Sequence, residues 1–180
     1  MKITPLLVLV AALSGCASEP RPLDTYDVSR ARRVLTLYDS GAFSTNHLFV
    51  FADDRVGVDV YQPQNVSPGE TRYVIAKQVW KTLDAKTAAL AWKQVEELKI
   101  SEWKEQYLPK DLGMVISDGT QWWIIFREGG REKMSGGDNV YPAVSPPGAP
   151  TLEIESLTGK SLPTGYHSLL RLLRDLTEKG

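Results

Sequence analysis

Gln121-Trp122-Trp123-Ile124-Ile125-Phe126 is the most strongly strand-forming stretch of this 180-residue chain. Aromatic and β-branched residues favour extended backbone. In a strand, successive side chains alternate between the two faces, so the second, fourth and sixth residues of the stretch share one face and the third and fifth share the other. Both faces are apolar, which predicts a central strand that is covered on both sides.

The neighbouring segments predict hairpins around this strand. Residues 112–117 are largely apolar and are followed by the turn pair Asp118-Gly119, so we expect them to pair with residues 121–126. Glu128-Gly129-Gly130 predicts a second turn, after which residues 131–135 form a short edge strand. Both turns indicate antiparallel neighbours.

The first half of the chain predicts a second group of strands. Residues 47–52 and 56–61 are rich in strand formers, and Asp53-Asp54 between them predicts a hairpin turn. Residues 32–38 and 71–83 predict further strands, and residues 63–69 a loop.

Two segments follow helical spacing. Asp84 is a candidate N-cap for a helix over residues 85–99, and residues 164–179 close the chain with a second helix. The expected buried positions are Ala88, Ala91, Trp92, Val95 and Leu98 in the first helix and Tyr166, Leu169, Leu170, Leu173 and Leu176 in the second. Residues 25–180 are therefore expected to form one α+β domain, with a mostly antiparallel β-sheet of five or six strands and two main α-helices.

Composition excludes several classes of function. The chain has 21 basic and 22 acidic residues and no basic block, so no nucleic-acid partner is expected. Its single cysteine cannot form an internal disulfide or a cysteine-rich zinc site, and its histidines, His47 and His167, lie far apart. No metal and no cofactor are expected.

The N-terminus has the order of an export signal. Lys2 supplies a positive charge, and the mostly apolar run up to Leu13 is too short to span a bilayer, which needs about 20 residues. Ser14 and Gly15 then precede the lone cysteine, Cys16. Two other interpretations of this segment are an ordinary secretory signal that happens to contain a cysteine and a buried N-terminal helix.

Leu13-Ser14-Gly15-Cys16 resembles the lipobox of bacterial lipoproteins at all four positions. The resemblance implies that residues 1–15 are removed by cleavage between Gly15 and Cys16, and that acyl chains attach to Cys16. Two or more chains anchor a protein stably. Residues 16–24 then form a tether to the membrane. Ala17 follows the cysteine, which in this family favours the outer membrane, so the expected location is the cell envelope, facing the periplasm.

The tryptophans and one long loop are candidate binding features. Trp80, Trp92 and one of the pair Trp122 and Trp123 are expected in the core, whereas Trp103, among charged neighbours, is the best candidate for exposure. Residues 136–150 carry four prolines. Their alternatives are a solvated connector and a docking loop. The candidate binding surface is formed by Trp103, Tyr141, Pro146 and Pro147.

Two functions remain open from the sequence. The first is a non-catalytic envelope lipoprotein that binds a protein or cell-wall partner through a sheet edge, residues 136–150 or Trp103. The second is a membrane-tethered hydrolase that uses carboxylates or His47. No catalytic residue is assigned, because no nucleophile motif occurs and an Asp53-Asp54-Asp59 cation cluster is less favoured than a hairpin turn.

Overall fold

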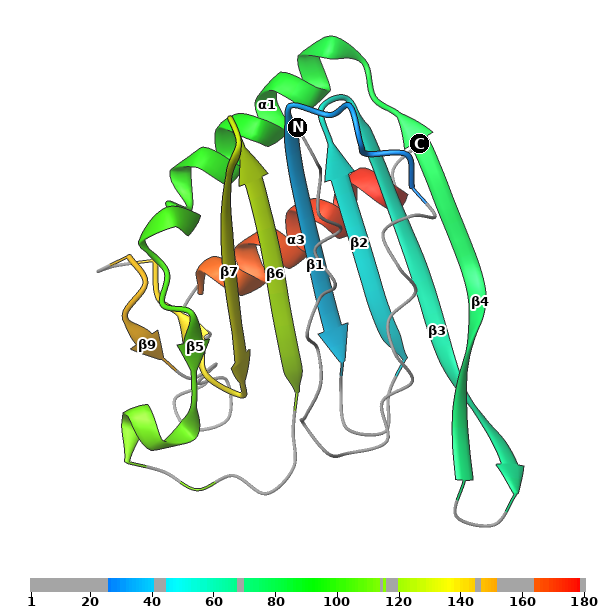
Figure 1. The fold of residues 1–180 in the computed structure, drawn as a ribbon, viewed down its shortest axis with the longest axis vertical. Coiled ribbons are helices and arrows are strands. Elements are labelled where there is room, and N and C mark those ends of the chain that lie inside the picture. Colours follow the sequence, from blue (N-terminus) through cyan, green and yellow to red (C-terminus); the bar gives the residue numbers. More distant parts are fainter. Residues whose placement is uncertain are drawn as a thin grey trace, which may run out of the picture.

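A seven-stranded sheet forms the body of the molecule in a computed structural model that describes residues 26–40, 45–67, 70–113, 115, 120–144, 147–151 and 164–178 (Figure 1). The strand order is β4-β3-β2-β1-β6-β7-β5. All neighbours are antiparallel except β5 and β7. The strands of this sheet are β1 (Arg33–Ser40), β2 (Asn46–Ala52), β3 (Arg55–Ser67), β4 (Glu70–Thr82), β5 (Gln106–Tyr107), β6 (Gln121–Glu128) and β7 (Arg131–Asp138).

The predicted class is confirmed, and the strand number differs slightly. Five or six strands were expected, and the seventh is β5, whose two residues are too few to show a periodic pattern. A separate two-stranded sheet joins β8 (Tyr141–Pro142) to β9 (Pro150–Thr151). The strand β6 is central, between β1 and β7, as its composition predicts. Its helix-facing Trp122 and Ile124 are buried, whereas Trp123 and Ile125 on the other face are only half-buried.

Both helices pack on one face of the sheet, behind it in Figure 1. They are α1 (Ala85–Glu97) and α3 (Gly165–Glu178), and short 3₁₀ turns, η2 (Ile100–Glu102) and η3 (Pro109–Leu112), follow α1. Asp84 caps α1 as predicted, because its Oδ1 accepts the amide of Thr87 at 2.9 Å. The predicted apolar residues of both helices are buried, except Leu98, which is half-buried.

The prediction of a strand over residues 112–117 is wrong where the structure describes it. Leu112 ends η3, Gly113 follows with φ of 68°, and Val115 is 97% exposed outside any strand; Met114 and residues 116–117 lie outside the described residues. The second predicted hairpin is confirmed, since the turn after Glu128 pairs β6 with β7; β7 is longer than predicted and lies between β6 and β5 rather than at the edge of the sheet. Gly129 and Gly130 have φ of 56° and 78°, and two successive positive φ angles make the tight turn that joins antiparallel strands.

The predicted loop over residues 63–69 is also corrected. β3 continues to Ser67, and β4 begins again at Glu70, while Pro68 and Gly69 lie outside the described residues. Backbone pairing between two long strands overrides the turn propensity of Pro63 because an edge-side hairpin tolerates proline. β3 and β4 therefore form a long ribbon that extends beyond the other strands (Figure 1).

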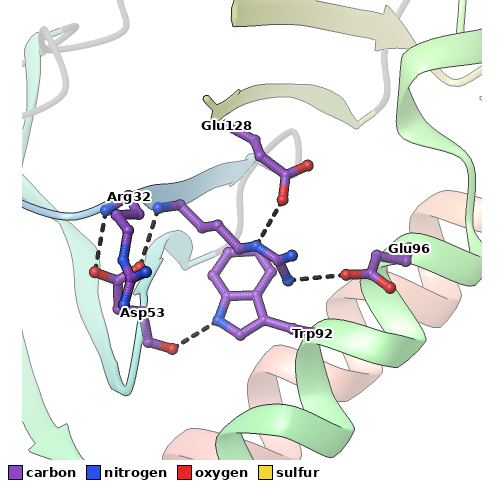
Figure 2. Close-up of polar contacts among 6 residues, drawn as sticks. Arg32, Asp53, Trp92, Glu96 and Glu128 are labelled. Carbon is purple, nitrogen blue, oxygen red and sulfur yellow. Dashed lines mark hydrogen bonds and ion pairs between the residues drawn. The ribbon is translucent and has the colours of Figure 1, made fainter. Parts of the chain in front are cut away.

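The Asp53-Asp54 turn is confirmed, and it is fixed by the Asp53 carboxylate (Figure 2). Both oxygens of that carboxylate accept backbone amides, from Arg32 and Arg33, at 3.0 Å. The Trp92 indole N–H donates to the Asp53 carbonyl at 2.6 Å. Arg33 binds Glu96 of α1 and Glu128 of β6 at 2.8 and 2.6 Å. The turn is thus joined to α1 and to the start of β1.

The segment before β1 lies on the face of the sheet opposite the helices. The Tyr26 hydroxyl donates to Oδ1 of buried Asp59 at 2.6 Å, and the Gln78 side-chain amide donates to the same oxygen at 2.7 Å. The Tyr26 ring lies 4.7 Å from the ring of Trp80. Gly57 permits this contact, because a Cβ there would lie 2.4 Å from the Trp80 ring. Burial, followed by the Asp59 hydrogen bond, raises the pKa of Tyr26 well above its ordinary value.

Candidate functional site

Trp103 is buried, so the prediction that it is exposed is wrong. Only 1% of the residue is accessible. Its indole N–H donates to the Leu98 carbonyl at 3.0 Å, and its ring meets Trp122 edge to face at 6.3 Å. The charged neighbours Glu102 and Lys104 point to solvent, but Trp103 ends the 3₁₀ turn η2 on its inner side. A local polar context therefore does not make this tryptophan a binding platform.

A second residue of the predicted binding surface, Tyr141, is likewise part of the core. Tyr141 is 5% exposed and stacks on Trp122 and Tyr166 at 6.1 and 5.1 Å. Pro147 is exposed, and Pro146 lies outside the described residues. The predicted lipid and cleavage residues, Cys16 and Gly15, also lie outside them.

The expected place in the core between helices and sheet is confirmed for Trp92 and for Trp122 of the adjacent pair. It is wrong for Trp80, which is half-buried and packs on the opposite face of the sheet, against Tyr26.

The candidate base, His47, lies in a polar group between the sheet and α3. Its Nδ1 is 4.0 Å from Oδ2 of Asp39, on the neighbouring strand β1. The Tyr166 hydroxyl donates to Oδ1 of Asp39 at 2.5 Å, and Arg174 lies 3.5 Å from Oδ2. These contacts join the two ends of α3 to the sheet through one carboxylate.

The surroundings of His47 favour its neutral form and lower its pKa. Burial is the main cause that lowers its pKa, and the Arg174 guanidinium adds to it, while Asp39 and Glu178 act in the opposite direction. Burial and the Asp39 carboxylate raise the pKa of Tyr166. A neutral imidazole can act as a base, so the space around it decides whether it can meet a substrate.

That space is too small for a substrate. The cavity beside His47 has a volume of about 60 Å³, whereas ligand pockets measure about 300–1,000 Å³. Thr177, the hydroxyl that lines it, donates to carbonyls of its own helix, at Leu173 and Arg174. Within the described ranges no three histidine, cysteine or acidic side chains gather as a metal site. The contacts of the His47 group join β1, β2 and α3.

The open feature of the molecule is the outer edge of β4. In the part of the chain that the structure describes, β4 pairs with β3 and with no other strand. It is thirteen residues long, and its Val74 and Ile75 are 36% and 37% exposed. An edge strand presents a row of backbone N–H and C=O groups that can pair with another extended chain. β4 thus has the properties of a binding edge.

The two faces of β4 differ in chemistry. Its pairing with β3 places Arg72, Lys77 and Lys81 opposite Gln64, Val60 and Val56, on the helix side. Tyr73, Ile75 and Trp80 lie on the other face. A register shift at Val60/Tyr61 leaves Ala76 as an extra, unmatched residue in β4. Because of this extra residue, the basic residues before and after Ala76 lie on the same face of the sheet.

The apolar face of β4 continues into an aromatic cluster. Tyr73 packs against this cluster, together with Trp123, whose ring stacks on Tyr38 at 5.5 Å. The buried members of the cluster are Tyr38, Leu48 and Tyr61. Sequence reasoning did not single out this edge, although the lysines in residues 71–83 are a known sign of an edge strand.

Comparison with known proteins gives no relative: no protein-family model and no curated protein sequence matches this chain. Among the helices of the described residues, none is both long and apolar enough to cross a membrane.

Proposed function

We propose that this protein is a lipid-anchored bacterial envelope protein that holds a partner protein along the edge strand β4, without catalysis. The observation that carries the proposal is the outer side of β4, which is thirteen residues long and has no strand beside it among the described residues. An extended peptide that adds a strand to such an edge gains affinity from main-chain hydrogen bonds and specificity from the side chains on either side.

The sequence supports both the lipid anchor and the proposed location in the cell envelope. Leu13-Ser14-Gly15-Cys16 matches a lipobox, and a diacylated or triacylated Cys16 would keep the domain at the membrane surface. Ala17 favours the outer membrane, with the domain facing the periplasm. The hydrolase alternative has less support, because the cavity beside His47 is of water size.

Photocrosslinking in the native cells tests the binding edge. A photoreactive amino acid at Gln78, which is exposed on β4, is expected to capture one defined partner. The matched control carries the same group at Glu132, which is exposed on β7 near the opposite edge. Equal capture of the same partner from both positions, or capture from Glu132 alone, contradicts the proposal.

Fractionation tests the anchor separately. Replacement Cys16→Ala is expected to move the protein out of the membrane fraction, because the acyl chains have no attachment site. A Cys16→Ala protein that remains in the membrane fraction rejects the lipoprotein assignment. It leaves the crosslinking result at Gln78 interpretable, since the edge is part of the folded domain.

A further inference from the structure

We infer that the segment held by β4 is an amphipathic strand in which acidic side chains alternate with apolar ones. The acidic side chains lie on the helix side of the sheet and the apolar ones on the opposite face. This inference rests on the proposed function and adds the chemistry of the partner to it. It follows from the division of charge and apolar surface between the two faces of β4.

The helix side of β4 carries three basic residues, which are separated by Val74 and Val79. Arg72, Lys77 and Lys81 all lie on this side, and Arg72 and Lys77 are exposed. β4 contains one acidic residue, Glu70, which is its first. Opposite charges on neighbouring strands contribute roughly 0.2–1 kcal/mol for each pair. A strand that adds to β4 therefore gains most when its side chains on the helix side are acidic.

The opposite face of β4 offers apolar surface at the same edge. Ile75 is 37% exposed, and Tyr73 beside it is half-buried. Trp80, further along the same face and beyond Gln78, is also half-buried. An added strand would place every second side chain next to these residues, because successive side chains alternate between faces. Apolar side chains at those positions would extend the aromatic cluster and remove Ile75 from water.

A second copy of this chain fits the edge less well. Antiparallel pairing of two β4 strands would bring two sets of three basic residues onto the same side of one sheet, and like charges on neighbouring strands are destabilising. The extra residue Ala76 also interrupts the regular edge. Lysines and bulges are devices that protect edges from pairing with their own kind. An acidic partner strand converts this repulsion into attraction.

Peptide binding to the purified full-length protein in detergent tests the inference. The probes are three capped ten-residue peptides that alternate valine with glutamate, glutamine or lysine. We expect the glutamate peptide to bind roughly tenfold more tightly than the glutamine peptide at low salt, an advantage that falls as salt is added. We expect the lysine peptide to bind most weakly.

Charge reversal on the edge supplies the decisive variant. Arg72→Glu with Lys77→Glu is expected to reverse the preference, so that the lysine peptide binds most tightly. Lys133→Glu on β7 is the matched control and is expected to leave the preference unchanged. Equal affinity for the glutamate and glutamine peptides, or a preference that survives the reversal, overturns the inference.

The crosslinked partner separates the two proposals. If Gln78 captures a partner whose crosslinked segment is neutral or basic, the inference about chemistry fails and the binding edge stands. If Gln78 captures no defined partner and none of the three peptides binds, both proposals fail. A captured segment with alternating acidic and apolar residues supports both.

Discussion

The two edges of the sheet differ in how they end. On one side, β5 adds only two residues beside β7, and Tyr107 of β5 is completely buried. On the other side, β4 runs for thirteen residues, with side chains that are exposed or half-buried wherever they are described. The first edge is closed by packing, and the second remains available for pairing. The packed edge and the edge proposed for binding thus lie at opposite sides of one sheet.

The closed side is built from aromatic rings whose polar atoms all have partners. The Tyr107 hydroxyl donates to the Gly148 carbonyl at 2.7 Å, and the Trp122 indole donates to the Val140 carbonyl at 3.0 Å. Gly137 lets the chain pass close to Trp122, since a Cβ there would lie 2.7 Å from the indole nitrogen. Such packing explains why Trp103 and Tyr141 are core residues.

The largest expected loss of stability comes from a substitution on the closed side of the sheet. Trp122→Ala should lower the free energy of unfolding by about 3–5 kcal/mol, because it removes a buried ring and leaves a cavity. Ile75→Ala on the open edge is the matched apolar truncation and should cost about 1 kcal/mol or less. Urea unfolding followed by circular dichroism measures both. Similar losses in the two variants would contradict the contrast between the edges.

The next largest effect concerns the hydrogen bond between Tyr26 and Asp59, on the face of the sheet opposite the helices. Tyr26→Phe should cost about 1.5–3 kcal/mol, because it removes a hydrogen bond to a buried carboxylate. Tyr73→Phe removes another hydroxyl from the same face and should change stability by under about 0.5 kcal/mol. The same urea titration compares them. Equal effects would show that Tyr26 does not hold the segment before β1 in place.

A smaller effect tests how firmly α1 is held to the sheet. Arg33→Gln should cost about 1 kcal/mol, because it removes two partly exposed ion pairs, with Glu96 and Glu128. In 1 M salt the difference from the unmodified protein should shrink, since salt screens surface charges. Arg32→Gln, next in the chain and exposed, should have no measurable effect. An Arg33→Gln loss that salt does not reduce would assign its role to stacking on Trp92.

The smallest effect is on the pH dependence near the open edge. The pKa of folded His47 lies below 6.5, so the unfolded chain binds the proton more tightly. Its contribution to stability is therefore present above pH 6.5 and is lost as the pH falls from there through the folded pKa. His47→Gln should flatten the rise of stability with pH in this window, and His167→Gln is the control. Thermal unfolding at a series of pH values measures the slope, and an unchanged slope in His47→Gln rejects the prediction.

Local patterns in the sequence predicted the elements that are locally determined. Asp84 accepts the amide of Thr87, three residues later, so its capping role could be predicted from residue type. Asp53-Asp54 could be predicted as a turn from residue type, whereas the hydrogen bonds of the Asp53 carboxylate to Arg32 and Arg33 join residues about twenty positions apart and could not. The final helix was predicted because its apolar residues repeat at helical spacing. The central place of residues 121–126 was predicted because both of their faces are apolar.

The errors concern properties that depend on distant residues. Residues 112–117 are apolar enough for a strand, but β7 occupies the position beside β6. Trp103 has polar neighbours in sequence, but it meets Trp122 in space. Residues 71–83 were predicted as a strand, and their lysines are a sign of an edge strand, but the sequence alone does not determine the order of the strands in the sheet. The candidate site is the side of β4 that has no neighbouring strand among the described residues, and its position follows from that order.

If Cys16 carries the proposed lipid anchor, the contact of Tyr26 with Trp80 limits how far from the membrane β4 can reach. Trp80 lies near one end of β4, and Glu70 at the other end is ten residues away, about 33 Å along a strand. Ten residues separate Tyr26 from Cys16, and a chain of that length spans at most about 33–36 Å. In a lipid-anchored protein, β4 thus extends away from the point where a short tether joins the domain. Its far end can meet a partner at up to roughly 70 Å from the bilayer surface.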